Sequence, residues 1–343
     1  MTSFRKADRS RPVAIWLSIT AMLVFAMVLV GGATRLTGSG LSITEWKPIS
    51  GVVPPLSGSA WLAEFHNYQR IPQYQLLNRG MSLDQFKAIY WWEWAHRLLG
   101  RLLGVVFAVP FVIFVATRRM PARLVWRCVV LFALGALQGL VGWWMVSSGL
   151  ERLVSVAPER LAAHLGLALI LYCALIWTAW EAWEGQGRPT RSSAWKPASA
   201  WFLALVYLQC LLGALVAGNK AGLIYNDWPL MDGQLFPQAY LQGDLGHSLL
   251  HSQAATQFDH RLVAYLVVIA GLALAALIAP ARQLPERFRF EAGLIGLLVL
   301  AQAGLGVSTL MLRVPLHLAL AHQLGAALLL AAAVTLAWRA RRI

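Results

Sequence analysis

Four histidines stand at spacings that are typical of paired ligands. His96 and His164 are 68 residues apart, and His260 and His322 are 62 residues apart. Each lies in or at the start of an apolar run, near the end that we expect to face the outside of a membrane. Two imidazoles at equal depth in one helix bundle can face each other across a gap, as axial ligation of haem iron requires. The spacing therefore predicts two haem sites, one for each pair, with these four residues as iron ligands.

Other roles for these histidines are less well supported. A single histidine in a membrane more often hydrogen-bonds a neighbouring helix or lines a polar cavity. Four at matched depth favour ligation, because polar groups in hydrocarbon are costly. Zinc is disfavoured, because no Cys, His or Asp completes a close-spaced tetrahedral set at either pair. The remaining four histidines are His66, His247, His251 and His317, and we expect them in exposed polar segments or beside His322 without sharing its ligand.

Glu93 distinguishes the two pairs. It precedes His96 by three residues, so it lies on the same helix face, one turn nearer the surface. At the matching place before His260 stands Gln257, which cannot ionise. We therefore expect the first haem to undergo chemistry beside a carboxylate and the second to carry electrons. The structural alternative is that Glu93 caps the positive end of its helix.

Three arginines accompany the histidines. Arg97 and Arg261 directly follow the first histidine of each pair, and Arg101 lies one turn beyond Arg97. Guanidinium groups suit carboxylates, so these residues are candidate contacts for haem propionates. Arg35 and Lys220 are further candidates. The alternative is anchorage to lipid phosphate.

The elements that position these residues are membrane helices. The chain is 58% hydrophobic and only 13% charged, whereas about a quarter of an ordinary soluble domain is charged. A hydrocarbon core about 30 Å thick needs roughly 20 apolar residues of helix. The sequence therefore predicts an all-α polytopic membrane protein with eight transmembrane helices. The expected spans are 12–33, 102–117, 128–150, 161–180, 197–219, 262–281, 292–312 and 314–338, the second and sixth lengthened by 92–101 and 257–261.

The basic residues predict the orientation. The formal charge is +14, and 17 of the 29 Lys and Arg residues lie in 52 positions of the termini and alternate connections. This asymmetry is typical of cytoplasmic segments and predicts both termini in the cytoplasm. The basic excess is then explained by orientation and by anionic membrane lipid, and we expect no nucleic-acid partner. The first apolar run is longer than a signal-peptide core, which favours an uncleaved first helix in a bacterial inner membrane.

Repeated motifs predict an internal duplication. The segments 32–48 and 213–229 both place a basic residue, Gly-Leu, an acidic residue, Trp and Pro in this order, and Gln138–Gly142 resembles Gln302–Gly306. We therefore expect two parallel-repeat four-helix bundles, one over residues 1–190 and one over 191–343. The long outer loop 34–92 is expected to fold as a cap with one or two interfacial helices. Cys128, Cys173 and Cys210 fall within apolar spans, where packing is their expected role.

Several motifs together resemble haem A synthases. They are Thr37-Gly-Ser-Gly-Leu-Ser-Ile-Thr-Glu-Trp-Lys-Pro with the following Ile-Ser-Gly-Val-Val-Pro-Pro, Glu93-x-x-His96-Arg97, Asn226-Asp-Trp-Pro-Leu-Met-Asp and Phe258-x-His260-Arg261. The resemblance covers nearly the whole chain. It implies oxidation of the C8 methyl of haem O to a formyl group, through an alcohol, which gives haem A for terminal oxidases.

The resemblance also implies roles for the site residues. His96 and His164 would hold the substrate haem, His260 and His322 a resident haem b, and Glu93 matches an essential glutamate. One branch of the family carries a cysteine pair in the first outer loop, and this sequence has none. Haem O synthase, which is a farnesyltransferase, and cytochrome oxidase assembly factors are the protein partners to consider, along with a homo-oligomer.

Two other classes of function use the same residues differently. A di-haem b-type electron carrier that exchanges electrons with quinol needs the histidine pairs but gives Glu93 no role. A transporter fits parallel repeats, but it explains the histidine pairs only if haem is the cargo. Only a synthase makes a new porphyrin, so extraction of the pigment distinguishes the three.

Overall fold

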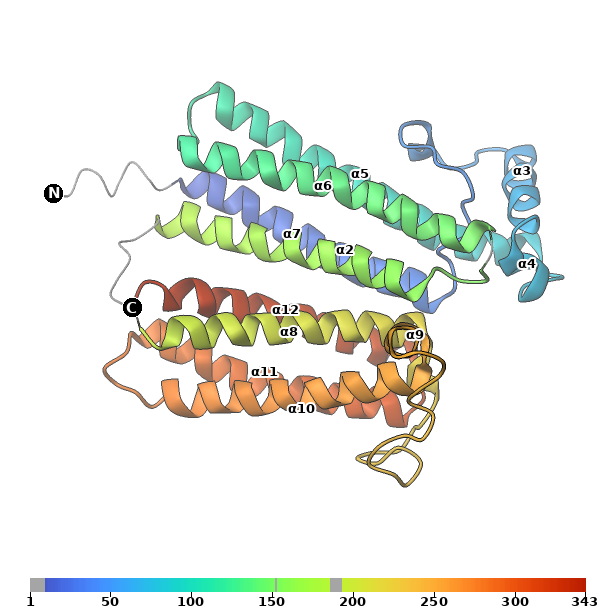
Figure 1. Ribbon diagram of the computed structural model, residues 1–343. Helices are drawn as coiled ribbons and strands as arrows, with labels where there is room; N and C mark the ends of the chain where they lie inside the picture. Colours follow the sequence, from blue (N-terminus) through green and yellow to red (C-terminus); the bar gives the residue numbers. More distant parts are fainter. Residues whose placement is uncertain (1–9, 152, 186–192) are drawn as a thin grey trace.

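The computed structural model describes residues 10–151, 153–185 and 193–343. Within these residues, eight helices are long and apolar enough to cross a membrane, which confirms the predicted all-α, eight-span fold. They run side by side in Figure 1, with the start of α2 and the end of α12 at one end of the molecule, which we call the end of the chain termini. The eight are α2 (Arg11–Leu36), α5 (Leu83–Ala116), α6 (Ala122–Glu151), α7 (Pro158–Glu184), α8 (Trp195–Gly218), α10 (Gln253–Ile278), α11 (Glu286–Met311) and α12 (Leu316–Ala340).

Helix α5 begins earlier than its apolar content predicts. We expected spanning helix from residue 92, whereas α5 starts at Leu83. Ser82 and Gln85 form a capping box, in which each side chain bonds the backbone N–H of the other, and this motif fixes a helix start. The first turns are amphipathic, and they bury Phe86 and Tyr90. The extra turns therefore carry α5 beyond the ends of its neighbours.

The long connections lie together at the end opposite the chain termini, which we call the capped end (Figure 1). The first connection holds η1 (Ser50–Val52), α3 (Gly58–Gln69) and α4 (Pro72–Leu76), and the second holds η2 (Ala221–Leu223) and α9 (Leu245–His251). In the first, Tyr68 and Phe86 are fully buried in an aromatic cluster with Phe65, Tyr74 and Tyr90. This cluster fixes α3 and α4 against the start of α5, as expected for a folded cap.

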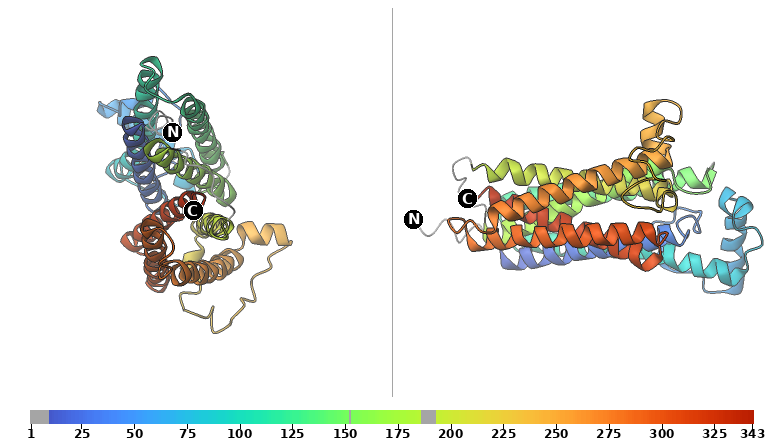
Figure 2. Two further views of the ribbon diagram at one scale, coloured as in Figure 1. Left: turned by 90° about the vertical axis from the view of Figure 1, so that its left-hand side faces the viewer. Right: turned by 90° about the horizontal axis from the view of Figure 1, so that it is seen from below.

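The spanning helices form two groups of four, which the end-on view of Figure 2 separates. Helices α2, α5, α6 and α7 contact one another in the first group, and α8, α10, α11 and α12 in the second. The groups meet where α7 packs on α8 and where α12 packs on α2 and α7. The division into halves at residue 190 and the repeat that would relate them stay predictions.

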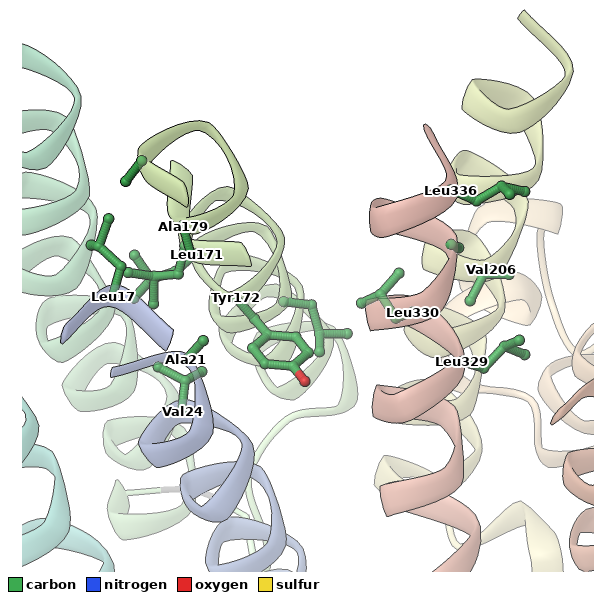
Figure 3. Close-up of a cluster of buried hydrophobic side chains, with 14 of the residues drawn as sticks. Leu17, Ala21, Val24, Leu171, Tyr172, Ala179, Val206, Leu329, Leu330 and Leu336 are labelled. Atoms are coloured by element: carbon green, nitrogen blue, oxygen red, sulfur yellow. The ribbon is translucent and has the colours of Figure 1, made fainter. Parts of the chain in front are cut away.

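The core is continuous across the junction between the groups. Figure 3 shows apolar side chains of α2 and α7 on one side and of α8 and α12 on the other. Leu17, Leu175, Leu330 and Leu336 are all at most 1% exposed and belong to one cluster. At the capped end, Arg35 of α2 donates to the carbonyls of Ala217 and Gly218, the last residues of α8. The two groups are therefore joined by both packing and helix capping.

The end of the molecule that carries the chain termini is held by buried carboxylates. Glu181 of α7 is fully buried and pairs with Arg127 of α6 at 2.6 Å and with Arg341 at 2.7 Å. One turn further, Glu184 pairs with Arg339 and Arg342 at 3.1 and 3.0 Å. The last residues of the chain thus complete a charged cluster of the first helix group.

One glycine at the junction gives a direct test of the packing. Gly218 is buried at the end of α8, where an added Cβ would lie 2.8 Å from Cα and Cβ of Pro158, at the start of α7. Because backbone cannot move aside cheaply, we expect Gly218→Ala to destabilise the protein by about 1–3 kcal/mol. Thermal unfolding in detergent should show a lower melting temperature.

The matched control is Gly104→Ala in α5, where a Cβ would meet nothing within 4 Å. Alanine is the better helix former by up to about 1 kcal/mol, so this variant should melt no lower than the parent protein. Equal melting temperatures for the two variants would contradict the close contact of α7 with α8.

Candidate functional site

His260 and His322 face each other inside the second helix group. Their ring centroids are 6.4 Å apart, and the ring planes are inclined by 81°. An iron between two imidazoles lies about 2 Å from each nitrogen, and each ring centre lies about 1 Å further, which gives roughly 6 Å between centres. The separation therefore fits one metal ion held by both rings.

The first pair lies in the corresponding helices of the other group. His96 is on α5 and His164 on α7. His164, His260 and His322 all lie six or seven residues after their helices begin at the capped end. His96 lies deeper within α5 only because that helix starts earlier. All four histidines are therefore near one end of the bundle.

Each of the four imidazoles rests against a glycine of the preceding spanning helix. A Cβ on these glycines would lie 2.9–3.2 Å from a ring atom of the histidine. Any larger residue would therefore push the ring from its place. The pairs are Gly31 with His96, Gly142 with His164, Gly213 with His260 and Gly306 with His322. This contact was not predicted from the sequence. The signal that could have indicated it is a glycine that recurs four residues after Met27, Gln138, Gln209 and Gln302.

Glu93 is 3% exposed and is bound through both carboxylate oxygens. Oε2 accepts from the hydroxyl of Ser42 at 2.8 Å and from the backbone N–H of Ile43 at 2.9 Å. Oε1 accepts from Nε and Nη2 of Arg97 at 3.1 and 2.7 Å. A carboxylate offers about four acceptor positions, so all of them are occupied. Glu93 thereby ties the first outer connection to α5, one turn from His96.

Gln257, at the matching position in the second group, donates hydrogen bonds to the chain connection, whereas Glu93 accepts them. Gln257 donates through Nε2 to the carbonyls of Ala221 and Ile224, at 2.8 and 2.6 Å. Its Oε1 accepts from Arg261 at 3.2 Å. The first outer connection thus presents donors to a carboxylate, whereas the second presents acceptors to an amide. A glutamine in place of Glu93 would turn its NH2 group toward donors. A glutamate in place of Gln257 would turn a carboxylate oxygen toward carbonyl oxygens, and both mismatches would be buried.

The three arginines bind the backbone of the outer connections. Arg97 donates to the carbonyl of Ile43, and Arg101 to those of Lys47 and Pro48. Arg261 donates to the carbonyls of Tyr225 and Leu230. Most of their donors are thus engaged within the protein. Nη1 of Arg101 and Nε of Arg261 are buried and have no partner in the described part of the chain, so each retains a donor for a ligand.

A cavity of about 580 Å³ lies under the first outer connection. Its lining includes Arg97 and Arg101 together with Glu64 and Lys47. Lys47 bonds Glu45 at 2.6 Å and Glu64 at 3.1 Å. These two partners, Glu45 first, raise the pKa of Lys47 above its ordinary value. The wall of the cavity therefore carries charged side chains, and Lys47 and Glu64 neutralise each other within it.

The other candidate residues lie away from the histidine pairs. His66 is on α3, where it bonds Gln69 at 3.0 Å, and the rings of His247 and His251 pack at 4.9 Å on α9. His317 is exposed at the start of α12. Cys128, Cys173 and Cys210 carry free thiols within α6, α7 and α8. Lys220 lies in the turn before η2 with a φ of 53°.

The fold defines a multi-pass helical membrane protein that carries one pair of histidines in each helix group. The chain belongs to the cytochrome oxidase assembly protein family, whose model matches residues 14–334. Its relatives include the Heme A synthase of Caulobacter sp. (strain K31), 58% identical over the whole of both chains. The Heme A synthase of Caulobacter vibrioides is 56% identical over the same extent. That of Parvibaculum lavamentivorans is 48% identical over all of this chain and 98% of its own length.

Proposed function

We propose that this protein oxidises haem O to haem A. The observation that carries the proposal is its identity of 58% to a Heme A synthase over the full length of both chains. The enzyme is an oxidoreductase with a haem substrate and a haem-type cofactor. The paired histidines on a helical membrane scaffold support this activity, because two haems are then held by separate helix groups.

The finer assignment places the substrate haem between His96 and His164 and a haem b between His260 and His322. The ring separation of 6.4 Å supports ligation at the second pair, and the glycines beside all four rings support a common design. The unpartnered donors of Arg101 and Arg261 suit haem propionates. The second haem would accept electrons and pass them on.

Glu93 is the residue that we assign to the chemistry. Oxidation removes electrons and protons from the C8 methyl carbon, which gains positive character that a carboxylate stabilises. Its four hydrogen bonds favour this electrostatic role over proton acceptance, because a proton would have to displace an existing donor. Ser42 and Arg97 then orient the carboxylate.

The membrane setting completes the proposal. We infer a bacterial inner membrane with both chain ends in the cytoplasm, because the basic residues concentrate at the end that carries the termini. The capped end then faces outward, and all four histidines lie near it. Contacts with haem O synthase or with oxidase assembly factors, and a homo-oligomer, stay predictions.

Extraction of the pigment tests the function. The protein should be purified from cells that also make haem O, and its haems extracted with acidic acetone and identified by mass. We expect haem B together with haem O or haem A. Haem B alone, although haem O is available, would overturn the proposal and favour the di-haem electron carrier.

A further inference from the structure

Three of the four histidines are also contacted by a glutamine, which lies four residues before the glycine on the same helix. The three sets are Gln138 and Gly142 facing His164, Gln209 and Gly213 facing His260, and Gln302 and Gly306 facing His322. On α2, the residue four before Gly31 is Met27. His96 thus differs from the other three, and the difference falls in the substrate site.

Each glutamine contacts the histidine in two places. Its Nε2 donates to the backbone carbonyl of the histidine, at 3.0 Å for Gln138 and Gln209 and at 2.8 Å for Gln302. The same nitrogen lies 3.0–3.1 Å from the Nδ1 atom of the ring, and for Gln138 and Gln209 it also lies 3.4 and 3.2 Å from Nε2. One amide therefore restrains both the main chain and the imidazole, and the glycine one turn further along the same helix restrains the ring as well.

The second polar atom of each amide has no partner. Oε1 of Gln138, Gln209 and Gln302 is buried and unbonded within the described residues. The backbone carbonyl of the histidine accepts from Nε2 and so fixes which end of the amide faces the histidine. Each glutamine therefore supports its histidine by holding the main chain and by packing its Nε2 against the ring.

Met27 occupies the equivalent place without these groups. Its Cε lies 3.4 Å from where a Cβ of Gly100 would be, and Gly100 is one turn beyond His96 on α5. A thioether has no N–H to donate and is only a weak acceptor. The imidazole of His96 therefore lacks the amide that restrains the other three rings.

We propose that Gln138, Gln209 and Gln302 are positioning residues that hold the ring and the main chain of their histidines, and that Met27 leaves His96 as the weakest iron ligand. The inference rests on the proposed function. Both ligands of the resident haem, His260 and His322, are then held by a glutamine. Of the two ligands of the substrate haem, only His164 is held in this way. This difference suits a site that must take up haem O and release haem A in each turnover.

The test compares Met27→Gln with Met27→Leu, which changes the side chain but adds no amide. Purified protein is mixed with excess apomyoglobin as a haem acceptor, and the haem that stays bound is extracted and identified over time. Loss of an outer-shell contact typically costs 10- to 100-fold in metal affinity. We therefore expect Met27→Gln to release haem O and haem A about 10-fold more slowly than the parent protein and Met27→Leu.

Haem B serves as the internal reference. Its content and release should be unchanged in Met27→Gln, which shows that the variant folds, and Gln209→Met should instead speed the release of haem B alone. Equal release of haem O and haem A from all Met27 variants would overturn the inference but leave the proposed function intact. Absence of haem O and haem A from every sample would refute the proposed function itself.

Discussion

Replacement of Glu93 by glutamine is expected to leave both haems bound and to stop the reaction at haem O. Glutamine keeps the size of the side chain and one acceptor oxygen for Ser42 and Ile43. It loses the charge that would stabilise a positive methyl carbon, and its amide NH2 faces the donors of Arg97 where a carboxylate oxygen accepted from them. We expect haem A formation to fall by roughly 100-fold or more. The measurement is the ratio of haem A to haem O in the extract, together with total haem per chain.

Ser42→Ala is the control for a purely structural effect. It removes one of the four donors to Glu93 but keeps the carboxylate, at a cost of about 0.5–1.5 kcal/mol in stability. If Glu93 acts through its charge, this variant should still make haem A. Full haem A production by Glu93→Gln would refute the catalytic assignment, as would an equal loss of activity in Ser42→Ala.

Replacement of His322 by methionine should remove haem B while the substrate haem is retained. The variant exchanges an imidazole for a thioether, which is a weaker donor to haem iron, so we expect affinity to fall by at least the roughly 10- to 100-fold caused by loss of a supporting contact. The visible spectrum and the extracted haems report the two sites separately. Haem A formation should fall as well, because the electron relay is lost.

His317→Met provides the matched control on the same helix. His317 is exposed and lies five residues before His322, so its loss should leave the haem content unchanged. Normal haem B in His322→Met, or equal loss in both variants, would contradict ligation by the second pair.

Residues that act within one helix or one repeat could be predicted from the sequence. Apolar length gave the eight helices, and the separation of Glu93 from His96 placed both on one face of α5. The packing of the histidines could not be predicted, because each ring rests on a glycine of another helix. Gln138 and Gln302 were recognised only as markers of the duplication, since nothing in their own helix indicates that their amides reach a histidine.

The arginines illustrate the same limit. Arg97 and Arg101 were expected to meet propionates, yet most of their donors bind backbone carbonyls of residues 43–48. Carbonyl direction depends on the path of an irregular segment, which residue type does not specify. The early start of α5 could have been found, because Ser82 and Gln85 form a recognisable capping sequence.

The buried carboxylates of α7 bear on how the chain is made. Glu181 leaves the ribosome about 160 residues before Arg341 does, the sequence separation of this ion pair. Until then it has only its partners on α6, and a buried carboxylate that lacks one of its partners is costly. Completion of this charged cluster therefore waits until Arg341 has been made. A chain that stops before Arg341 leaves Glu181 without this partner, which would mark the truncated product as incompletely folded.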